Sequence, residues 1–218
     1  MKKLHIVIPI YPKVDLIDVT VTFDALSRIP SYWKERELDL QIVAATTDPI
    51  MTGQGVKITP TSTFDAYRNT TLDVLLVPGS EDTSPATGDD TLMKFVKKKG
   101  KTAKVVASVC TGALILGKAG LLDGYEATTH WFALDTLKAM KNVRVVNGYP
   151  RWVHDRNRLT GGGVSSSLDA TLYLISQITD DQTAKCCQLI LQYHPQPPFN
   201  TGDPAVADPQ TYLKVVYG

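Results

Sequence analysis

The sequence has few cysteines, no excess of charge and no long apolar run, and each absence argues against a class of protein. Lys and Arg number 23 against 22 Asp and Glu, so the basic excess that favours nucleic-acid binding is missing. No apolar stretch approaches the roughly 20 residues that span a bilayer. The three cysteines are an odd number, and two of them, Cys186 and Cys187, are neighbours, which argues against a disulfide framework. We therefore expect a cytoplasmic protein that binds neither nucleic acid nor membrane and has no metal site and no cofactor.

The rest of the composition is that of an ordinary folded chain. Hydrophobic residues make up 43% of its 218 residues, and this length is enough for one large core. Residues 4–10 form an apolar run behind two lysines, but the run is short and lacks a small-residue cleavage site, so it predicts a buried strand and not a signal peptide. We expect one domain over residues 1–218, with an extended tail from about residue 195 that packs on the surface or on a partner subunit.

Apolar strand-like runs alternate with segments of helical periodicity. Strands are predicted at residues 4–10, 38–45, 72–77, 104–109, 143–146 and 152–154, with a hairpin-like excursion at 53–60. Helices are predicted at 15–28, 89–99, 111–119, 131–140, 164–177 and 180–193. This alternation indicates an α/β fold with a mostly parallel sheet covered on both faces. Ligands bind outside the carboxyl ends of such strands, which directs attention to residues 11–20, 78–81, 110–112 and 160–164.

Cys110 stands where a β-branched strand stops and a helix of small residues begins. Ser108 and Gly112 flank it two residues away on each side, as in a nucleophile elbow, where small neighbours expose the central side chain. A helix N-terminus also favours a thiolate. The alternative is an inert, buried cysteine, which is how we interpret Cys186 and Cys187 within a helical pattern.

Several short motifs follow one another along residues 4 to 202. They are Tyr11-Pro12, Leu16-Ile17-Asp18-Val19-Thr20, Val77-Pro78-Gly79, Ser108-Val109-Cys110-Thr111-Gly112, Gly117-x-Ala119-Gly120-Leu121-Leu122-Asp123-Gly124, Ala127-Thr128-Thr129-His130-Trp131, Leu159-Thr160-Gly161-Gly162-Gly163 and Pro197-Pro198-Phe199-Asn200. In this order they resemble the ThiJ/PfpI superfamily, whose class I glutamine amidotransferase-like fold is a flavodoxin-like three-layer sandwich. More narrowly, they are similar to isocyanide (isonitrile) hydratases and to the amidase-like domains of AraC-type regulators.

The resemblance implies a set of site residues. Protease-like members carry His directly after the nucleophile, whereas this chain has Thr111, as the hydratase-like branch does. In that branch an aspartate from the first strand–helix segment lies beside the cysteine, and Asp18 matches it. The backbone N–H groups of Gly79 and Thr111 are expected to hold developing charge, with a further hydrogen bond from the Thr111 hydroxyl. The residues expected to line a substrate pocket are Tyr11, His130, Trp131, Gly162 and Val164.

Two assignments stay open at this point. Asp15 lies on roughly the same helical face as Asp18, so spacing alone does not choose between them, and Asp18 can also be interpreted as a helix N-cap. The Asp-Val-Thr context favours Asp18 as the acid. His130 either orients or protonates at the site or is a packing histidine beside Trp131.

The resemblance implies hydration of a small apolar isocyanide, R–NC, to an N-substituted formamide by a carbon–oxygen lyase. Cys110 attacks the terminal carbon, a protonated Asp18 supplies a proton to give a thioimidate, and its carboxylate then activates water. Asp18 needs a raised pKa for this task. A homodimer is also implied.

Three other functions compete with this one. A glyoxalase- or deglycase-like activity is disfavoured because those members usually present a glutamate near the cysteine, where this chain offers aspartates. A regulator of the AraC type needs roughly 100 further residues for its DNA-binding region. A redox sensor or chaperone-like dimer uses the same activated thiolate, so the sequence leaves it open.

Overall fold

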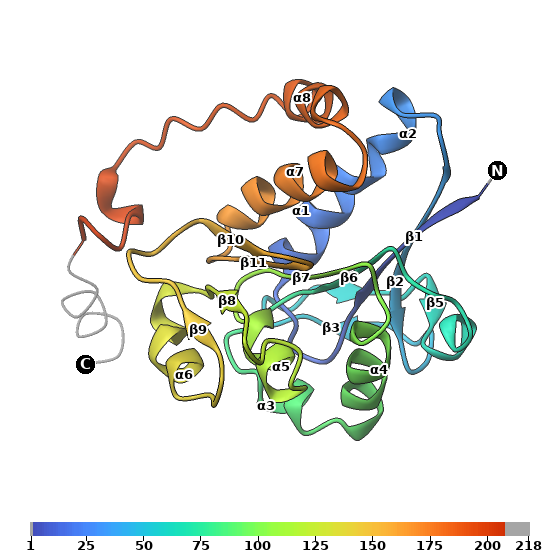
Figure 1. Ribbon diagram of the computed structural model, residues 1–218, viewed down its shortest axis with the longest axis horizontal. Coiled ribbons are helices and arrows are strands. Elements are labelled where there is room, and N and C mark those ends of the chain that lie inside the picture. The colour runs from blue at the N-terminus through green and yellow to red at the C-terminus, as the bar shows by residue number, and fades with distance from the viewer. Residues whose placement is uncertain (1, 208–218) are drawn as a thin grey trace.

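The computed structural model describes residues 2–207, and a seven-stranded sheet runs through the middle of the molecule (Figure 1). All neighbouring strands pair in parallel except the antiparallel pair β10 and β11. Five of them, β2-β1-β6-β7-β11, have the order 2-1-3-4-5 of flavodoxin-like sheets, so the predicted mostly parallel α/β architecture is confirmed. Across the sheet the strands are β10 (Trp152–Asp155), β11 (Arg158–Gly161), β7 (Val105–Ser108), β6 (Val74–Val77), β1 (Lys3–Pro9), β2 (Glu37–Ala44) and β5 (Ser62–Thr63).

Helices cover both faces of this sheet (Figure 1). One face carries α1 (Leu16–Ser27), α2 (Ile29–Tyr32), α7 (Ser166–Ile178) and α8 (Asp181–Ile190). The other carries α3 (Ser84–Thr87), α4 (Asp90–Gly100), α5 (Gly112–Lys118) and α6 (Leu134–Lys138). Within residues 2–207 none of the helices has the length and apolar character that a bilayer span needs. Short peripheral elements are the antiparallel β3 (Ile50–Met51) and β4 (Lys57–Ile58), the parallel β8 (Glu126–Ala127) and β9 (Arg144–Val145), and the 3-10 turns η1 (Asp65–Tyr67), η2 (Trp131–Ala133) and η3 (Asn200–Gly202).

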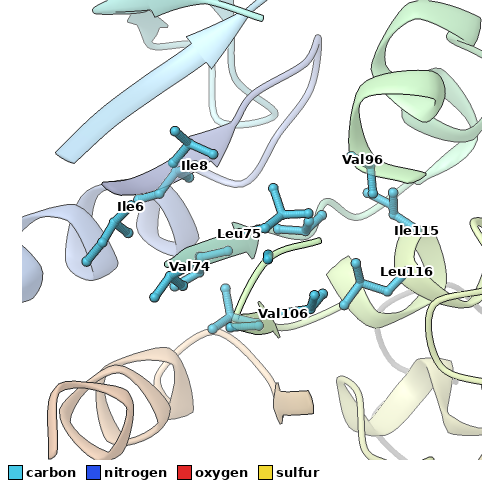
Figure 2. Close-up of a cluster of buried hydrophobic side chains, with 14 of the residues drawn as sticks. Ile6, Ile8, Val74, Leu75, Val96, Val106, Ile115 and Leu116 are labelled. Atoms are coloured by element: carbon cyan, nitrogen blue, oxygen red, sulfur yellow. The ribbon is translucent and has the colours of Figure 1, made fainter. Parts of the chain in front are cut away.

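The hydrophobic core lies between the central strands and the helices. All four residues of β6 are buried, as expected of a strand covered on both faces. Figure 2 shows part of this core, where strand side chains gather beside those of α4 and α5; the labelled residues are Ile6, Ile8, Val74, Leu75, Val96, Val106, Ile115 and Leu116. This packing holds the carboxyl ends of β1, β6 and β7 at one edge of the sheet, where the candidate site lies.

Most predicted elements are present, and the differences concern short ones. The hairpin predicted at residues 53–60 is present but begins earlier in the chain. Its two strands are β3 and β4, and its turn covers residues 52–56. The sequence shows no pattern for α2, α3, β5 and β8, and it does not predict β11 as a separate strand. Each of these elements has only two to four residues, too few for a periodic pattern. The helix predicted at 131–140 begins as η2, and α8 ends at Ile190. After α8 the chain has no helix or strand before η3 in the region predicted as a tail, of which residues 208–218 lie outside the described residues.

Candidate active site

Cys110 occupies the turn between β7 and α5 in a backbone conformation that side chains rarely adopt. Its φ is 54°, in the left-handed region, where a residue other than glycine is strained. Hydrogen bonds hold this conformation from both sides. The Cys110 N–H donates to the Gly162 carbonyl at 2.8 Å, and the Thr129 hydroxyl donates to the Cys110 carbonyl at 2.9 Å. The turn has the sharp strand-to-helix geometry that the elbow motif predicts.

Gly112, the small residue that the elbow motif requires, allows α5 to start against the end of β6. A Cβ atom at this position would collide with the carbonyl oxygen of Val77. Since that oxygen is backbone of a central strand, it cannot move aside without disturbing the sheet. The absence of a side chain at Gly112 therefore permits the sharp reversal that presents Cys110.

Asp15 and Asp18 have different positions, which decides between the two interpretations left open by their spacing. Asp15 is the N-cap of α1, and its carboxylate accepts hydrogen bonds from the backbone N–H groups of Ile17 at 3.0 Å and Asp18 at 3.2 Å. Asp18 lies inside the first turn and is fully buried. The interpretation of Asp18 as the N-cap is therefore wrong, and Asp18 is the aspartate that lies against the elbow.

Two neutral donors hold the Asp18 carboxyl. The Gly79 N–H donates to Oδ2 and the Ser167 hydroxyl donates to Oδ1, each at 3.0 Å. Burial, reinforced by the negative charge of Asp15, raises the pKa of Asp18 to about 7, although the Gly79 N–H, the Ser167 hydroxyl and the Cys110 thiol each act to lower it. The carboxyl can therefore both give and take a proton near neutral pH.

The Cys110 thiol lies in a similarly dry environment, with 5% of the residue exposed. Burial raises the pKa of the thiol and the nearby charge of Asp18 raises it further, whereas the backbone N–H groups of Thr111 and Val164 lower it. The N–H group of Thr111 at the helix N-terminus favours the thiolate, as expected, but burial outweighs it. The Cys110 thiol favours the ionised form of Asp18, whereas the charge of Asp18 disfavours the thiolate, so the pair holds one negative charge more readily than two.

The groups predicted to stabilise developing charge, on Gly79 and Thr111, make hydrogen bonds to other parts of the protein. The Gly79 N–H donates to Asp18 and so orients the acid, while its role as a donor to developing charge on a substrate stays a prediction. The Thr111 hydroxyl donates to the Ser80 carbonyl at 2.6 Å and accepts from the Ser80 N–H at 2.8 Å. It therefore ties the elbow to the turn after β6, while the Thr111 N–H acts on the sulfur of Cys110.

A cavity of about 500 Å³ lies next to the elbow: it is lined by Thr129 and Gly162, which hydrogen-bond to the Cys110 backbone, but not by Cys110 or Asp18 themselves. Four of the five residues predicted to line a pocket form part of its wall, namely His130, Trp131, Gly162 and Val164. The fifth, Tyr11, is buried beneath the turn after β6, and its hydroxyl donates to the Pro78 carbonyl at 2.9 Å, so its role here is to support that turn. Further apolar side chains in the wall are Ile17, Val21, Tyr149 and Leu168.

His130 lies against Gly163 at this cavity, and a Cβ atom on that glycine would collide with the imidazole. Burial lowers the pKa of His130 to about 4, although the charge of Asp15 opposes this, so the ring is neutral near pH 7. Its Nδ1 accepts a hydrogen bond from the Phe132 N–H at 3.4 Å, and its ring packs 5.5 Å from that of Trp131 between centroids. These contacts favour a packing role in the cavity wall.

The sequence interpretation missed Ser167, whose hydroxyl binds Asp18, and Val164 as an N–H donor to the sulfur. Ser167 belongs to a run of three serines after the Gly161-Gly162-Gly163 motif, and nothing in that run distinguishes it from its neighbours. Across residues 2–207, no group of three or more His, Cys, Asp and Glu side chains could hold a metal ion.

Comparison with known proteins identifies relatives over most of the chain. The model of the DJ-1/PfpI family matches residues 4–177. An isonitrile hydratase from Pseudomonas putida is 35% identical over 91% of this chain and 82% of its own length. A crystal structure of a ThiJ/PfpI family protein from Pseudomonas syringae superposes with a TM-score of 0.87 and 34% identity, covering 99% of this chain and 86% of the other. A deglycase from Pyrococcus horikoshii is 26% identical over 64% of this chain and 80% of its own length.

Proposed function

The chain belongs to the DJ-1/PfpI family, and we propose that it is an isonitrile hydratase, which adds water to R–NC to give an N-substituted formamide. One observation carries this proposal: Cys110, presented on a strained elbow, lies beside Asp18, a buried carboxyl whose pKa is raised to about 7. The similarity to the Pseudomonas putida isonitrile hydratase supports it.

The first step joins the substrate to the enzyme. The pair carries one negative charge, which rests on Asp18 in the favoured form, and transfer of the Cys110 proton to Asp18 gives the reactive thiolate and the protonated acid. The sulfur attacks the terminal carbon of R–NC while Asp18 protonates the same carbon, so one C–S and one C–H bond form. The product is the thioimidate R–N=CH–S–Cys110, and Asp18 is left ionised.

Water then completes the reaction. The Asp18 carboxylate takes a proton from water as the oxygen attacks the thioimidate carbon, and it passes a proton to the nitrogen, which gives R–NH–CH(OH)–S–Cys110. Asp18 next takes the hydroxyl proton as the C–S bond breaks. The formamide R–NH–CHO leaves, and the pair returns to a Cys110 thiolate and a protonated Asp18. The Asp18 carboxyl carries out each proton transfer in turn, and a pKa near the working pH allows it to give and to accept a proton.

The cavity suits the organic group of a small apolar isonitrile. Ile17, Val21, Trp131 and Leu168 supply apolar wall beside the elbow. His130 is neutral near pH 7, and the Arg151 guanidinium that also lines the cavity is paired with Asp169. We therefore expect alkyl and aryl isonitriles to be accepted. The homodimer that the family resemblance implies remains a prediction, and light scattering of the purified protein tests it.

The two alternative functions for the same thiol are tested alongside. A glyoxalase- or deglycase-like enzyme would consume methylglyoxal, and the 26% identity to a deglycase motivates that assay. A redox sensor would accumulate oxidised Cys110 at low peroxide. The thiol is buried, which limits the access of peroxide to the sulfur and argues against fast oxidation.

The decisive experiment measures formamide. The purified protein is incubated with cyclohexyl isocyanide or para-nitrophenyl isocyanide, and the matching formamide is quantified by liquid chromatography and mass spectrometry. We expect product with the wild type and with Cys186→Ala, a matched cysteine variant in α8, and none with Cys110→Ala. Equal product from Cys110→Ala, or consumption of methylglyoxal without any formamide from the isonitriles, would contradict the proposal.

A further inference from the structure

Ser167 stands across the site from Asp18, 149 residues away in the sequence. Its hydroxyl donates to Asp18 Oδ1 at 3.0 Å, and both residues are fully buried. The other carboxyl oxygen, Oδ2, accepts the Gly79 N–H. Each oxygen is thus held by a donor from a different element, and rotation of the carboxyl would leave buried polar atoms without partners, at a substantial cost in free energy.

The turn that carries Ser167 also contacts the thiol. The Val164 N–H acts on the sulfur of Cys110, and the Ser167 N–H donates to the Val164 carbonyl at 3.2 Å. One hydrogen-bonded turn, residues 163–167, therefore contacts both members of the Cys110–Asp18 pair. A shift of this turn would move the donors of the sulfur and of the carboxyl together.

Hydrogen-bond donors have to hold the Asp18 carboxylate because no cation does so. Among residues 2–207 no Lys, Arg or His forms an ion pair with Asp18. The titratable neighbours that shift its pKa most are Asp15 from its own helix and Cys110 from the elbow, and the charge of Asp18 acts on Tyr11 below the turn. None of these is a cation. A hydroxyl differs from the Gly79 N–H in one respect: it can donate to the carboxylate and, after rotation, accept from the acid.

We propose that Ser167 is a positioning residue for Asp18: its hydroxyl holds the carboxyl beside Cys110 and keeps the ionised form accessible near neutral pH. The catalytic consequence rests on the proposed isonitrile hydration, whereas the effect on the protonation of Asp18 does not. The inference is therefore testable without any substrate.

The test is a pH titration of the Asp18 side chain by ¹³C NMR in protein labelled at the aspartate carboxyl carbons. The Asp18 signal is assigned by its loss in Asp18→Asn. In Ser167→Ala we expect its midpoint to rise by about one pH unit, because a donor to the ionised form is lost. Ser167→Thr keeps a hydroxyl and should restore the wild-type midpoint.

Ser166→Ala is the matched control. Ser166 lies in the same turn, but its hydroxyl donates to the Gly163 carbonyl at 2.6 Å and not to Asp18, so the midpoint should stay within about 0.2 pH units of the wild type. An unchanged midpoint in Ser167→Ala, or an equal rise in both variants, would overturn the proposal. If Ser167→Ala does not fold, Ser167→Cys replaces it, with a smaller rise expected from the weaker thiol donor.

A kinetic measurement separates this inference from the proposed function. If the protein hydrates isonitriles, the acidic limb of the pH profile of kcat should move in Ser167→Ala by the same amount as the NMR midpoint. If no isonitrile is turned over, the proposed function fails while the titration still decides the role of Ser167. A drop in kcat with an unmoved pH profile would indicate a merely structural role and contradict the proposal.

Discussion

Two buried aspartates at opposite ends of the parallel strands have pKa values that are shifted in opposite directions. Asp73 directly precedes β6, and Asp18 lies beyond the carboxyl ends of the strands; the two residues are 6% and 0% exposed respectively. Each accepts a backbone N–H, from His5 at 2.9 Å for Asp73 and from Gly79 at 3.0 Å for Asp18. The pKa of Asp73 is nevertheless lowered to about 2, whereas that of Asp18 is raised to about 7.

The difference comes from the charges that face each carboxylate. Burial acts to raise the pKa of both. At Asp73 this effect is overcome by Arg36, which makes two hydrogen bonds at 2.9 and 2.6 Å, and by Lys104 at 2.7 Å. At Asp18 only neutral donors oppose it, and the charge of Asp15 adds to it. The same residue type therefore makes a structural ion pair at one end of the sheet and a proton donor and acceptor at the other.

Replacing Asp18 should affect activity and replacing Asp73 should affect stability. The largest expected effect is on the turnover of the Asp18 variant. Asp18→Asn removes the proposed proton carrier and should lower kcat for isonitrile hydration by at least about 10³-fold. Asp15→Asn removes a neighbouring carboxylate of the same helix and should retain most of the activity. Formamide production by both variants is the measurement. Loss of activity in Asp15→Asn with retention in Asp18→Asn would transfer the acid–base role to Asp15.

Asp18→Asn should at the same time stabilise the fold at high pH. Because the folded pKa of Asp18, about 7, lies above its ordinary value of 3.8, the stability present at low pH is lost as the pH rises between these two values. The free energy of unfolding of Asp18→Asn relative to the wild type should therefore grow from pH 4 to pH 8, by roughly 4 kcal/mol at most at 1.36 kcal/mol per pKa unit. Urea unfolding across this range measures it. A difference that does not vary with pH would contradict the ionisation assigned to Asp18.

Asp73→Asn should do the reverse and destabilise the fold near neutral pH. It leaves Arg36 and Lys104 facing each other without a counter-charge, and we expect a loss of roughly 2 kcal/mol in the free energy of unfolding. Since the folded pKa of Asp73 is depressed, its contribution is present above pH 3.8 and is lost as the pH falls towards 2, so the difference should shrink over that window. Asp90→Asn, which breaks an exposed pair, is the control and should cost under about 0.5 kcal/mol. Equal losses of unfolding free energy in Asp73→Asn and Asp90→Asn would contradict the structural role assigned to the ion pairs of Asp73.

The smallest expected effect is the change in the pKa of Asp18 when the charge of Asp15 is removed. Asp15→Asn removes the negative charge that raises the pKa of Asp18 but preserves a side chain able to cap α1. The titration midpoint of Asp18 should fall by a few tenths of a pH unit. The ¹³C titration described for Ser167 measures this shift. An unchanged midpoint would mean that the charge of Asp15 does not act on Asp18, and a rise would contradict the direction of its effect.

The first helix shows where prediction from the sequence stops. The spacing of Leu16, Val19, Phe23 and Leu26 predicts a helix with an apolar face, and α1 is present. The structure turns that face so that two polar residues are buried, Asp18 and Thr22, while Leu16 and Phe23 are only partly buried. Thr22 is satisfied by a hydrogen bond of 2.6 Å to the Asp18 carbonyl, and Asp18 by partners from other elements. Hydrophobic periodicity cannot detect such a face, because it counts polar residues as exposed.

The sequence by itself determined the order of the main strands and helices and the turn at Cys110, because apolar periodicity and the small residue at Gly112 are local properties of the chain. Only the tertiary structure decided which aspartate meets the cysteine and what holds it there. The donors to Asp18 come from Gly79 and Ser167, which are 61 and 149 residues away. Such distant contacts, and the burial that raises the pKa of Asp18, exist only once the helices have packed on the sheet, since burial depends on every element that excludes water from the site.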